Sequence, residues 1–137
     1  MKAASFSTSG FRQLDRLLAK MAAAPADRKA VTSVLRRGAN VIAREERATI
    51  HVVSGRTRDS ITVTTRPGFD IGRELGDVVV FVGPRKGGAG SRAHLLEWGT
   101  THSPAYPFAR PALDRKGDEA IGVIVAGLGE IMKAKAR

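Results

Sequence analysis

Residues 94–113 read HLLEWGTTHSPAYPFARPAL, and this stretch decides how the rest of the chain is arranged. It holds the only Trp and the only Tyr of the chain and three of its six Pro. Gly99 can end a short apolar segment because glycine adopts a positive φ without steric cost. Pro104 and Pro107 hold the backbone that follows extended, and Pro111 suits the first turn of a helix. The sequence therefore predicts that this stretch is a rigid aromatic elbow that leads into a C-terminal helix.

The composition predicts one small domain. The chain has 137 residues, of which 42% are apolar but only 5% aromatic, so its core must consist of Val, Ile, Leu and Ala. It has no Cys, which excludes disulfides and thiolate metal sites. It also lacks the apolar run of a signal peptide or a membrane span. We expect a protein that is made and kept soluble, without a membrane partner or a cofactor.

The positive charge is concentrated in the first half of the chain. The formal net charge is +10, and residues 1–66 carry 13 Lys and Arg against 5 Asp and Glu. Such a basic half can contact phosphates or an acidic protein surface. Charge alone does not separate these two possibilities.

Two helices are predicted in the basic half. Apolar residues at helical spacing place the first over residues 9–23, and Pro25 suits the start of the second, which reaches about residue 47. An apolar stripe and a set of arginines divide the surface of the second helix. These arginines are either a solvated face or contacts for DNA or an acidic partner, and the candidates are Arg36, Arg37, Arg44 and Arg47.

The middle of the chain predicts a small antiparallel sheet. β-Branched residues at 60–65 and the apolar run at 77–82 read as strands, and the second run is apolar enough for a central strand. The Gly-rich segment 85–92 that follows lacks the spacing of a phosphate-binding loop. We expect this segment to be a mobile loop that orders against a neighbouring molecule.

The last element is a long helix over residues 111–136. Four glycines lie in it, each of which costs up to about 1 kcal/mol relative to Ala, so the helix needs close packing on the sheet or a covering partner. The predicted fold is a single α+β domain over residues 1–137, with a small antiparallel sheet packed against N-terminal helices and a long C-terminal helix. Its parts are a helical basic half (1–48), the sheet, Gly-rich loop and elbow (49–113) and the C-terminal helix (111–136).

No catalytic or metal site is evident. His94 and Glu97 share a helical face, with His102 nearby, but the His-Glu-x-x-His motif does not occur. There is no Gly-x-Ser-x-Gly elbow for a serine nucleophile, and Glu45 and Glu46 diverge on a helix. We therefore expect no enzymatic activity.

Glu97 is a candidate for partial burial between Leu96 and Trp98. A buried carboxylate needs an Arg or backbone N–H partner, and Arg110 lies close enough in sequence to supply it. The alternative is an exposed pair worth less than about 1 kcal/mol.

The same stretch resembles a phage family. Glu97-Trp98-Gly99-Thr100 and then Pro107-Phe108-Ala109-Arg110-Pro111-Ala112 follow an E-x-G-T … P-F-x-R-P-A signature. It is similar to that of the small tail-component or neck proteins of lambda-like long-tailed bacteriophages. Residues 54–61 add a weaker match, in which Ser54 and Thr57 replace the usual Thr and Leu. The resemblance covers most of the chain from about Val41 onward.

The resemblance implies a structural protein of the virion, present in the host cytoplasm during assembly. Its role would be neck assembly or tail completion at the head–tail junction. Its partners would be further copies in a ring around the DNA channel, expected to be hexameric, and neighbouring neck, stopper or tail-terminator proteins. Non-specific contact with DNA in the channel is compatible with this role.

Ring contacts favour aromatic and arginine anchors. The candidate interface residues are Trp98, Tyr106, Phe108, Arg110, Arg85, Lys86 and Arg92. The alternative for Trp98 and Phe108 is a place in the core between elbow and sheet. The alternative function is a small basic nucleic-acid-binding protein that uses the arginine-rich helix, although this helix lacks aromatics for base stacking.

Overall fold

The computed structural model describes residues 25–67, 78–135 and 137. The elements in chain order are α2 (Pro25–Thr49), α3 (Arg56–Asp59), β1 (Ile61–Pro67), β2 (Val78–Pro84), the 3-10 helix η1 (Gly88–Arg92), α4 (Ala93–Trp98) and α5 (Ala109–Lys135). The helix expected over 9–23 lies outside the described residues. The protein is a single α+β domain with a two-stranded antiparallel sheet and a long C-terminal helix, as the sequence predicts.

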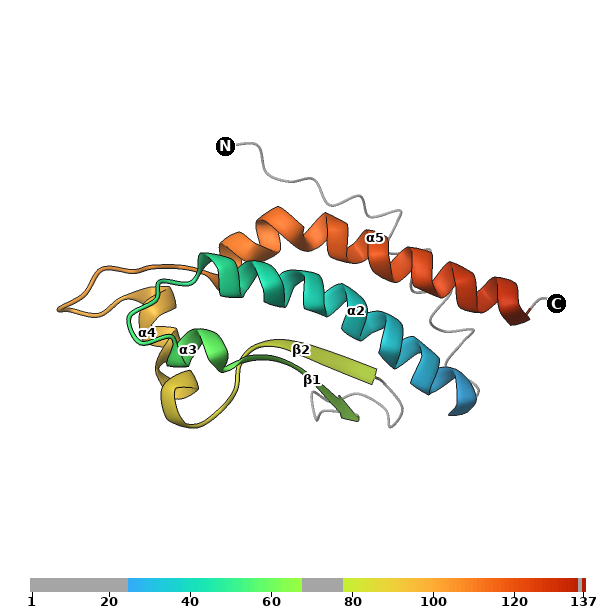
Figure 1. Cartoon of the computed structure of the whole chain (residues 1–137), viewed down its shortest axis with the longest axis horizontal. Coiled ribbons are helices and arrows are strands. Elements are labelled where there is room, and N and C mark those ends of the chain that lie inside the picture. Colours follow the sequence, from blue (N-terminus) through green and yellow to red (C-terminus); the bar gives the residue numbers. More distant parts are fainter. Residues whose placement is uncertain (1–24, 68–77, 136) are drawn as a thin grey trace.

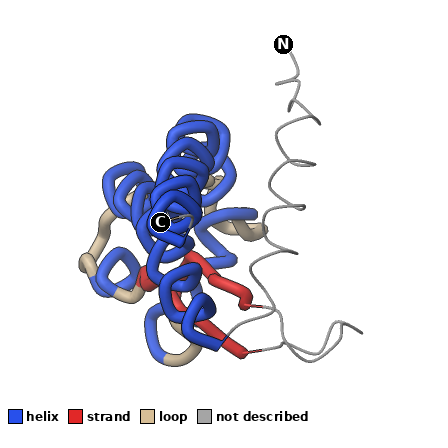
Figure 2. Tube along the Cα trace, turned by 90° about the vertical axis from the view of Figure 1, so that its right-hand side faces the viewer, coloured by secondary structure: helices blue, strands red, loops and turns tan. Residues whose placement is uncertain are grey.

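Helix α2 lies between the sheet and α5 (Figures 1 and 2). One side of α2 packs along α5, where Val31 and Val34 form a cluster with Leu128. The other side faces both strands. Close packing, one of the two alternatives expected for the glycine-rich C-terminal helix, is present, but the glycine that makes the close approach, Gly127, meets α2 rather than the sheet. The long helix packs mainly on α2 and reaches the sheet cluster at its N-terminal end, through Ala109.

Glycines permit the close approach of α2 and α5. A β-carbon at Gly38 would lie 2.5 Å from Cγ1 of Ile124, and one at Gly127 would lie 2.7 Å from Cγ1 of Val34. Real β-carbons do not approach so closely, so these positions need glycine while the helices keep this distance. By contrast, nothing lies within 4 Å of a β-carbon at Gly122 or Gly129.

The two strands form a regular ladder. Ile61 is opposite Pro84 at one end and Pro67 is opposite Val78 at the other. Ile61 is 1% exposed, and Val63 and Val82 pack against the same core cluster, which also contains Ala43, Ile50, Ala93 and Phe108. Because side chains alternate between the faces of a strand, this face of the sheet is the one that meets α2.

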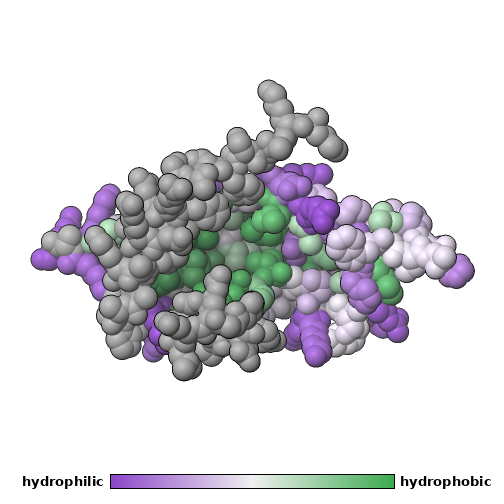
Figure 3. Space-filling model, turned by 180° about the vertical axis from the view of Figure 1, so that it is seen from behind, coloured by the Kyte–Doolittle hydropathy of each residue, from purple (hydrophilic) through white to green (hydrophobic). Residues whose placement is uncertain are grey.

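The prediction that residues 77–82 form a central strand is wrong for the described part of the chain. There β2 pairs with β1 alone. Its side chains are half-buried, and Phe81 is 41% exposed. The apolar run suggested burial on both faces, but only one face covers α2. Seen from behind, apolar surface gathers in the middle of the molecule (Figure 3).

A candidate protein-interaction surface

The elbow is held by backbone hydrogen bonds. Gly99 ends α4 with a φ of 75°, and a β-carbon there would lie 2.8 Å from the backbone N of Ala105, so this turn requires glycine. Thr100 and Ser103 bond each other across a tight turn, with N···O distances of 2.9 and 3.3 Å. The N–H of Tyr106 then donates to the carbonyl of Leu96 at 2.7 Å. The predicted rigidity of the elbow therefore has a geometric basis.

Glu97 ties α4 to the start of α5. Its carboxylate accepts the backbone N–H groups of Phe108, Ala109 and Arg110, at 2.8, 3.1 and 3.3 Å. The first N–H groups of a helix have no partner within it, and the helix dipole makes this end positive. Glu97 therefore caps α5 although it lies eleven residues before Phe108 in the chain.

Electrostatics fits this capping role. Burial acts to raise the pKa of Glu97, but the three backbone N–H groups and the positive charge of Arg110 outweigh it. The pKa of this carboxyl consequently lies below its ordinary value. The predicted pairing with Arg110 is only partly right, because Arg110 bonds Glu97 through its backbone N–H and the ion pairs of the described residues do not include these two side chains.

The Arg110 guanidinium lies over Trp98 instead. Its Cζ is 5.4 Å from the ring centroid, within range of a cation–π interaction. Trp98 is 69% exposed, and with Glu97, Pro107 and Pro111 it lines an open hollow of about 380 Å³. An exposed Trp stacked with Arg on a fixed support is typical of a contact anchor.

Phe108, one of the predicted interface residues, is buried in the core. It is 2% exposed and belongs to the core cluster under the sheet, so it cannot serve as a contact residue. Of the two alternatives left open for the aromatic residues, the core applies to Phe108 and the surface applies to Trp98. Tyr106 is 42% exposed and stacks on His51, with ring centroids 4.4 Å apart. This stack joins the elbow to the segment that follows α2.

Sequence reasoning missed the burial of Glu46. It is 3% exposed, and its Oε2 has no hydrogen-bond partner among the described residues. Burial first, and then the charge of Glu97, raises the pKa of Glu46 to about 7, although Arg47 acts in the opposite direction. The only sequence signal was its place on the apolar side of α2, three residues after Ala43. Because Arg44, Glu45 and Arg47 surround Glu46 in the sequence, the segment reads as a solvent-exposed charged face.

The Gly-rich segment 85–92 contains a folded turn in the single chain, which corrects the expectation that it orders only against a neighbour. The N–H of Arg85 donates to the carbonyl of Ser60 at 2.8 Å, and the N–H of Gly87 donates to Oγ of Ser91 at 2.9 Å. Residues 88–92 form η1. The three candidate cations of this segment are exposed, namely Arg85, Lys86 and Arg92.

The candidate arginines of α2 are all exposed, yet two of them bond the sheet. Arg36 Nη1 donates to Oγ1 of Thr65 at 3.0 Å, and Arg47 Nη2 donates to the carbonyl of Ile61 at 2.6 Å. Arg37 lies beside α5, and Arg44 Nε donates to the carbonyl of Asn40 at 3.5 Å. Arg36 and Arg47 thus help to hold the sheet on α2.

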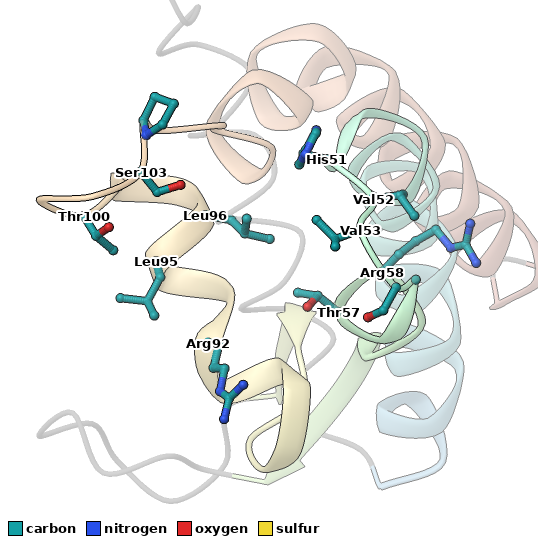
Figure 4. A pocket seen from close by; sticks show the side chains of 13 residues that line it. His51, Val52, Val53, Thr57, Arg58, Arg92, Leu95, Leu96, Thr100 and Ser103 are labelled. Carbon is teal, nitrogen blue, oxygen red and sulfur yellow. The ribbon is translucent and has the colours of Figure 1, made fainter.

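A groove that the sequence did not predict lies between α4 and the segment that follows α2. It has a volume of about 300 Å³ and is lined by His51, Val52, Val53, Ser54, Gly55, Thr57, Arg58, Arg92, Leu95, Leu96, Thr100, Ser103 and Pro104. Leu96 and Val53 face the gap from opposite walls, and Arg92 lies at its lower end (Figure 4). We call this feature the groove.

Within the ranges 25–67 and 78–135, no three His, Asp or Glu side chains gather to hold a metal ion. No helix in these same ranges is both long enough and apolar enough to cross a bilayer.

Comparison with known proteins places the chain in a family. Residues 12–99 match the family described as "Bacteriophage HK97-gp10, putative tail-component". The match begins earlier than the resemblance inferred from the sequence and ends at Gly99, so Pro107–Ala112 lie beyond it. Searches of curated proteins and of solved structures found no significant match to the chain. Because the matched residues make up more than half of the chain, the protein belongs to the HK97-gp10-like family of bacteriophage tail components.

Proposed function

We propose that the protein is a structural subunit of the phage head–tail junction that acts in neck assembly or tail completion. In this proposal, copies form a closed ring around the DNA channel, expected to be hexameric. The ring contacts neighbouring neck, stopper or tail-terminator proteins and belongs to the mature virion. The role is structural rather than enzymatic.

The observation that carries the proposal is the exposed Trp98, fixed between the cap of α5 and the Arg110 guanidinium. Glu97 and Gly99 flank it, and both are locked by backbone hydrogen bonds. A preorganised aromatic side chain loses little conformational entropy on binding, so it is suited to an interface anchor. In a member of a tail-component family, such an anchor supports assembly with other virion proteins.

The test is electron microscopy of lysates from a null mutant of the gene in its phage or prophage. We expect DNA-filled heads apart from tails, or tails with defective ends. Complementation with Trp98→Ala should reproduce this defect. Val125→Ala is the matched control, because Val125 is also exposed (47%) but lies on α5 away from the elbow, and it should restore intact particles.

Intact particles at normal yield from the null mutant would overturn the proposal. The alternative function, nucleic-acid binding through the exposed arginines of α2, would then be the one to test. Its expected signature is binding that weakens steeply with salt.

A further inference from the structure

The lining of the groove and the sequence of residues 68–77 are complementary in charge, and both are rich in apolar side chains. We propose that the groove receives residues 68–77, the connection between β1 and β2, from a neighbouring copy of the chain. Copies would then join head to tail. This inference rests on the proposed ring, since it identifies one contact within it.

The groove offers an apolar surface to its occupant. Val52, Val53 and Leu95 are 48%, 86% and 41% exposed, and Leu96 is half-buried between the walls. Contiguous exposed apolar side chains are uncommon on soluble monomers unless another molecule covers them. The volume of about 300 Å³ has room for a large apolar side chain.

The charge around the groove selects an acidic occupant. Arg58 and Arg92 line it, whereas no Asp or Glu does. Arg58 is paired with Asp59 at 3.0 Å, but Arg92 has no ion-pair partner within the described ranges. Arg56 and Lys86, on α3 and after β2, are further exposed cations at this end. An occupant that carries both apolar and acidic side chains satisfies the groove.

Residues 68–77 have this composition. Their sequence, GFDIGRELGD, has three large apolar side chains, Phe69, Ile71 and Leu75. It has three acids and one Arg, a net charge of −2 in a chain of +10.

The position of this segment favours binding to a second copy. Residues of α3 and α4 line the groove, and these two helices lie beside the Ile61–Pro84 end of the sheet (Figure 1). Residues 68–77 connect Pro67 to Val78 at the other end. Six residue steps separate the two ends, about 20 Å at 3.3 Å per residue. A ten-residue connection fixed at both ends has eleven Cα–Cα steps, so its tip extends at most about 20 Å. It can reach the Ile61–Pro84 end of the sheet at most, and the groove of its own chain lies beyond that end. Repetition of such a contact between unlike surfaces forms a ring when the rotation between successive copies closes, as the proposed function requires.

The chain has no Cys, which makes disulfide trapping a clean test. The double variant Val53→Cys, Leu75→Cys of the full chain is oxidised gently at high protein concentration. We expect a ladder of covalent dimers and larger species on a non-reducing gel. The control Asp118→Cys, Leu75→Cys replaces the groove position by an exposed position of α5 and should give an order of magnitude less of these species.

A second measurement does not depend on the cysteine variants. A fluorescent peptide of sequence GFDIGRELGD should bind the unaltered protein saturably. Arg92→Glu should weaken this binding about fivefold or more, because it places like charges together. Circular dichroism checks that the variant remains folded.

A disulfide within one monomer, equal ladders from test and control, or a peptide that does not bind would overturn the inference. A further result would also overturn it: DNA protects the thiol of Val53→Cys from reaction with maleimide, and the double variant stays monomeric. The occupant of the groove would then be nucleic acid. The null-mutant microscopy would still report a junction role in each of these cases, so the two failures can be told apart.

Discussion

The Glu97 Oε2 atom accepts the backbone N–H of Phe108 at 2.8 Å, and the ring of Phe108 is 2% exposed beneath the sheet. One bond therefore links the end of α4, the start of α5 and the core. It leaves the next residue after Glu97, Trp98, on the outside with 69% of its surface exposed. The contact anchor and the folded core thus depend on the same short segment.

Glu97→Ala should destabilise the fold by about 1–2 kcal/mol. The substitution removes the acceptor for three N–H groups at the positive end of α5. Urea unfolding measures the loss. Glu130→Ala, exposed near the other end of α5, is the control and should change stability by less than about 0.5 kcal/mol. Equal effects of the two substitutions would refute the capping role.

The stability of the protein should fall as the pH rises from about 4.5 through 7. Glu46 has a folded pKa of about 7, above its ordinary value of 4.5, so the folded state binds its proton more tightly than the unfolded chain. Its contribution to stability is therefore complete below pH 4.5 and lost above 7. Glu97 has a lowered pKa and acts in the opposite direction, losing its contribution only as the solution becomes more acidic.

Glu46→Gln isolates this effect. The amide keeps the shape of the side chain without the buried charge, so the variant should gain about 1–3 kcal/mol over the parent at pH 8 and much less at pH 5. Urea unfolding at both pH values is the measurement, and Glu130→Gln is the exposed control. A gain of equal size at both pH values would contradict the assigned ionisation.

The two neighbouring aromatic residues should separate folding from assembly. Phe108→Ala leaves a cavity in the core cluster and should cost about 3–5 kcal/mol of stability. Trp98→Ala should change stability by less than about 1 kcal/mol but abolish particle assembly. Thermal unfolding and complementation measure the two properties. Normal assembly with a folded Trp98→Ala protein would rule out the anchor.

Glycines on α5 should respond in opposite directions to replacement by Ala. At Gly127 the new β-carbon would lie 2.7 Å from Val34 and push α2 away, which should destabilise the protein by about 1–3 kcal/mol. Gly122 has open space around it, so Ala there should stabilise by up to about 1 kcal/mol through helix propensity. Thermal unfolding compares the pair. Stabilisation by both would show that the helices do not pack at the described distance.

The sequence by itself determined the elements whose signals are local. Pro25 begins α2, β-branched residues form β1, and Gly99 with its positive φ ends α4. These features follow from backbone sterics within a few residues, so no knowledge of distant contacts was needed. The aromatic elbow and its link to a terminal helix were predictable for the same reason.

Only the tertiary structure decided which side chains are buried, paired or exposed. Glu97 bonds N–H groups eleven to thirteen residues away, Glu46 is buried, and Val53 lies exposed on a groove wall opposite Leu96. The order of layers, with α2 between sheet and α5, depends on Gly38 and Gly127 meeting Ile124 and Val34 across the helix crossing. Such contacts join residues far apart in the chain, and their energies depend on three-dimensional packing, which no local pattern of residue types specifies.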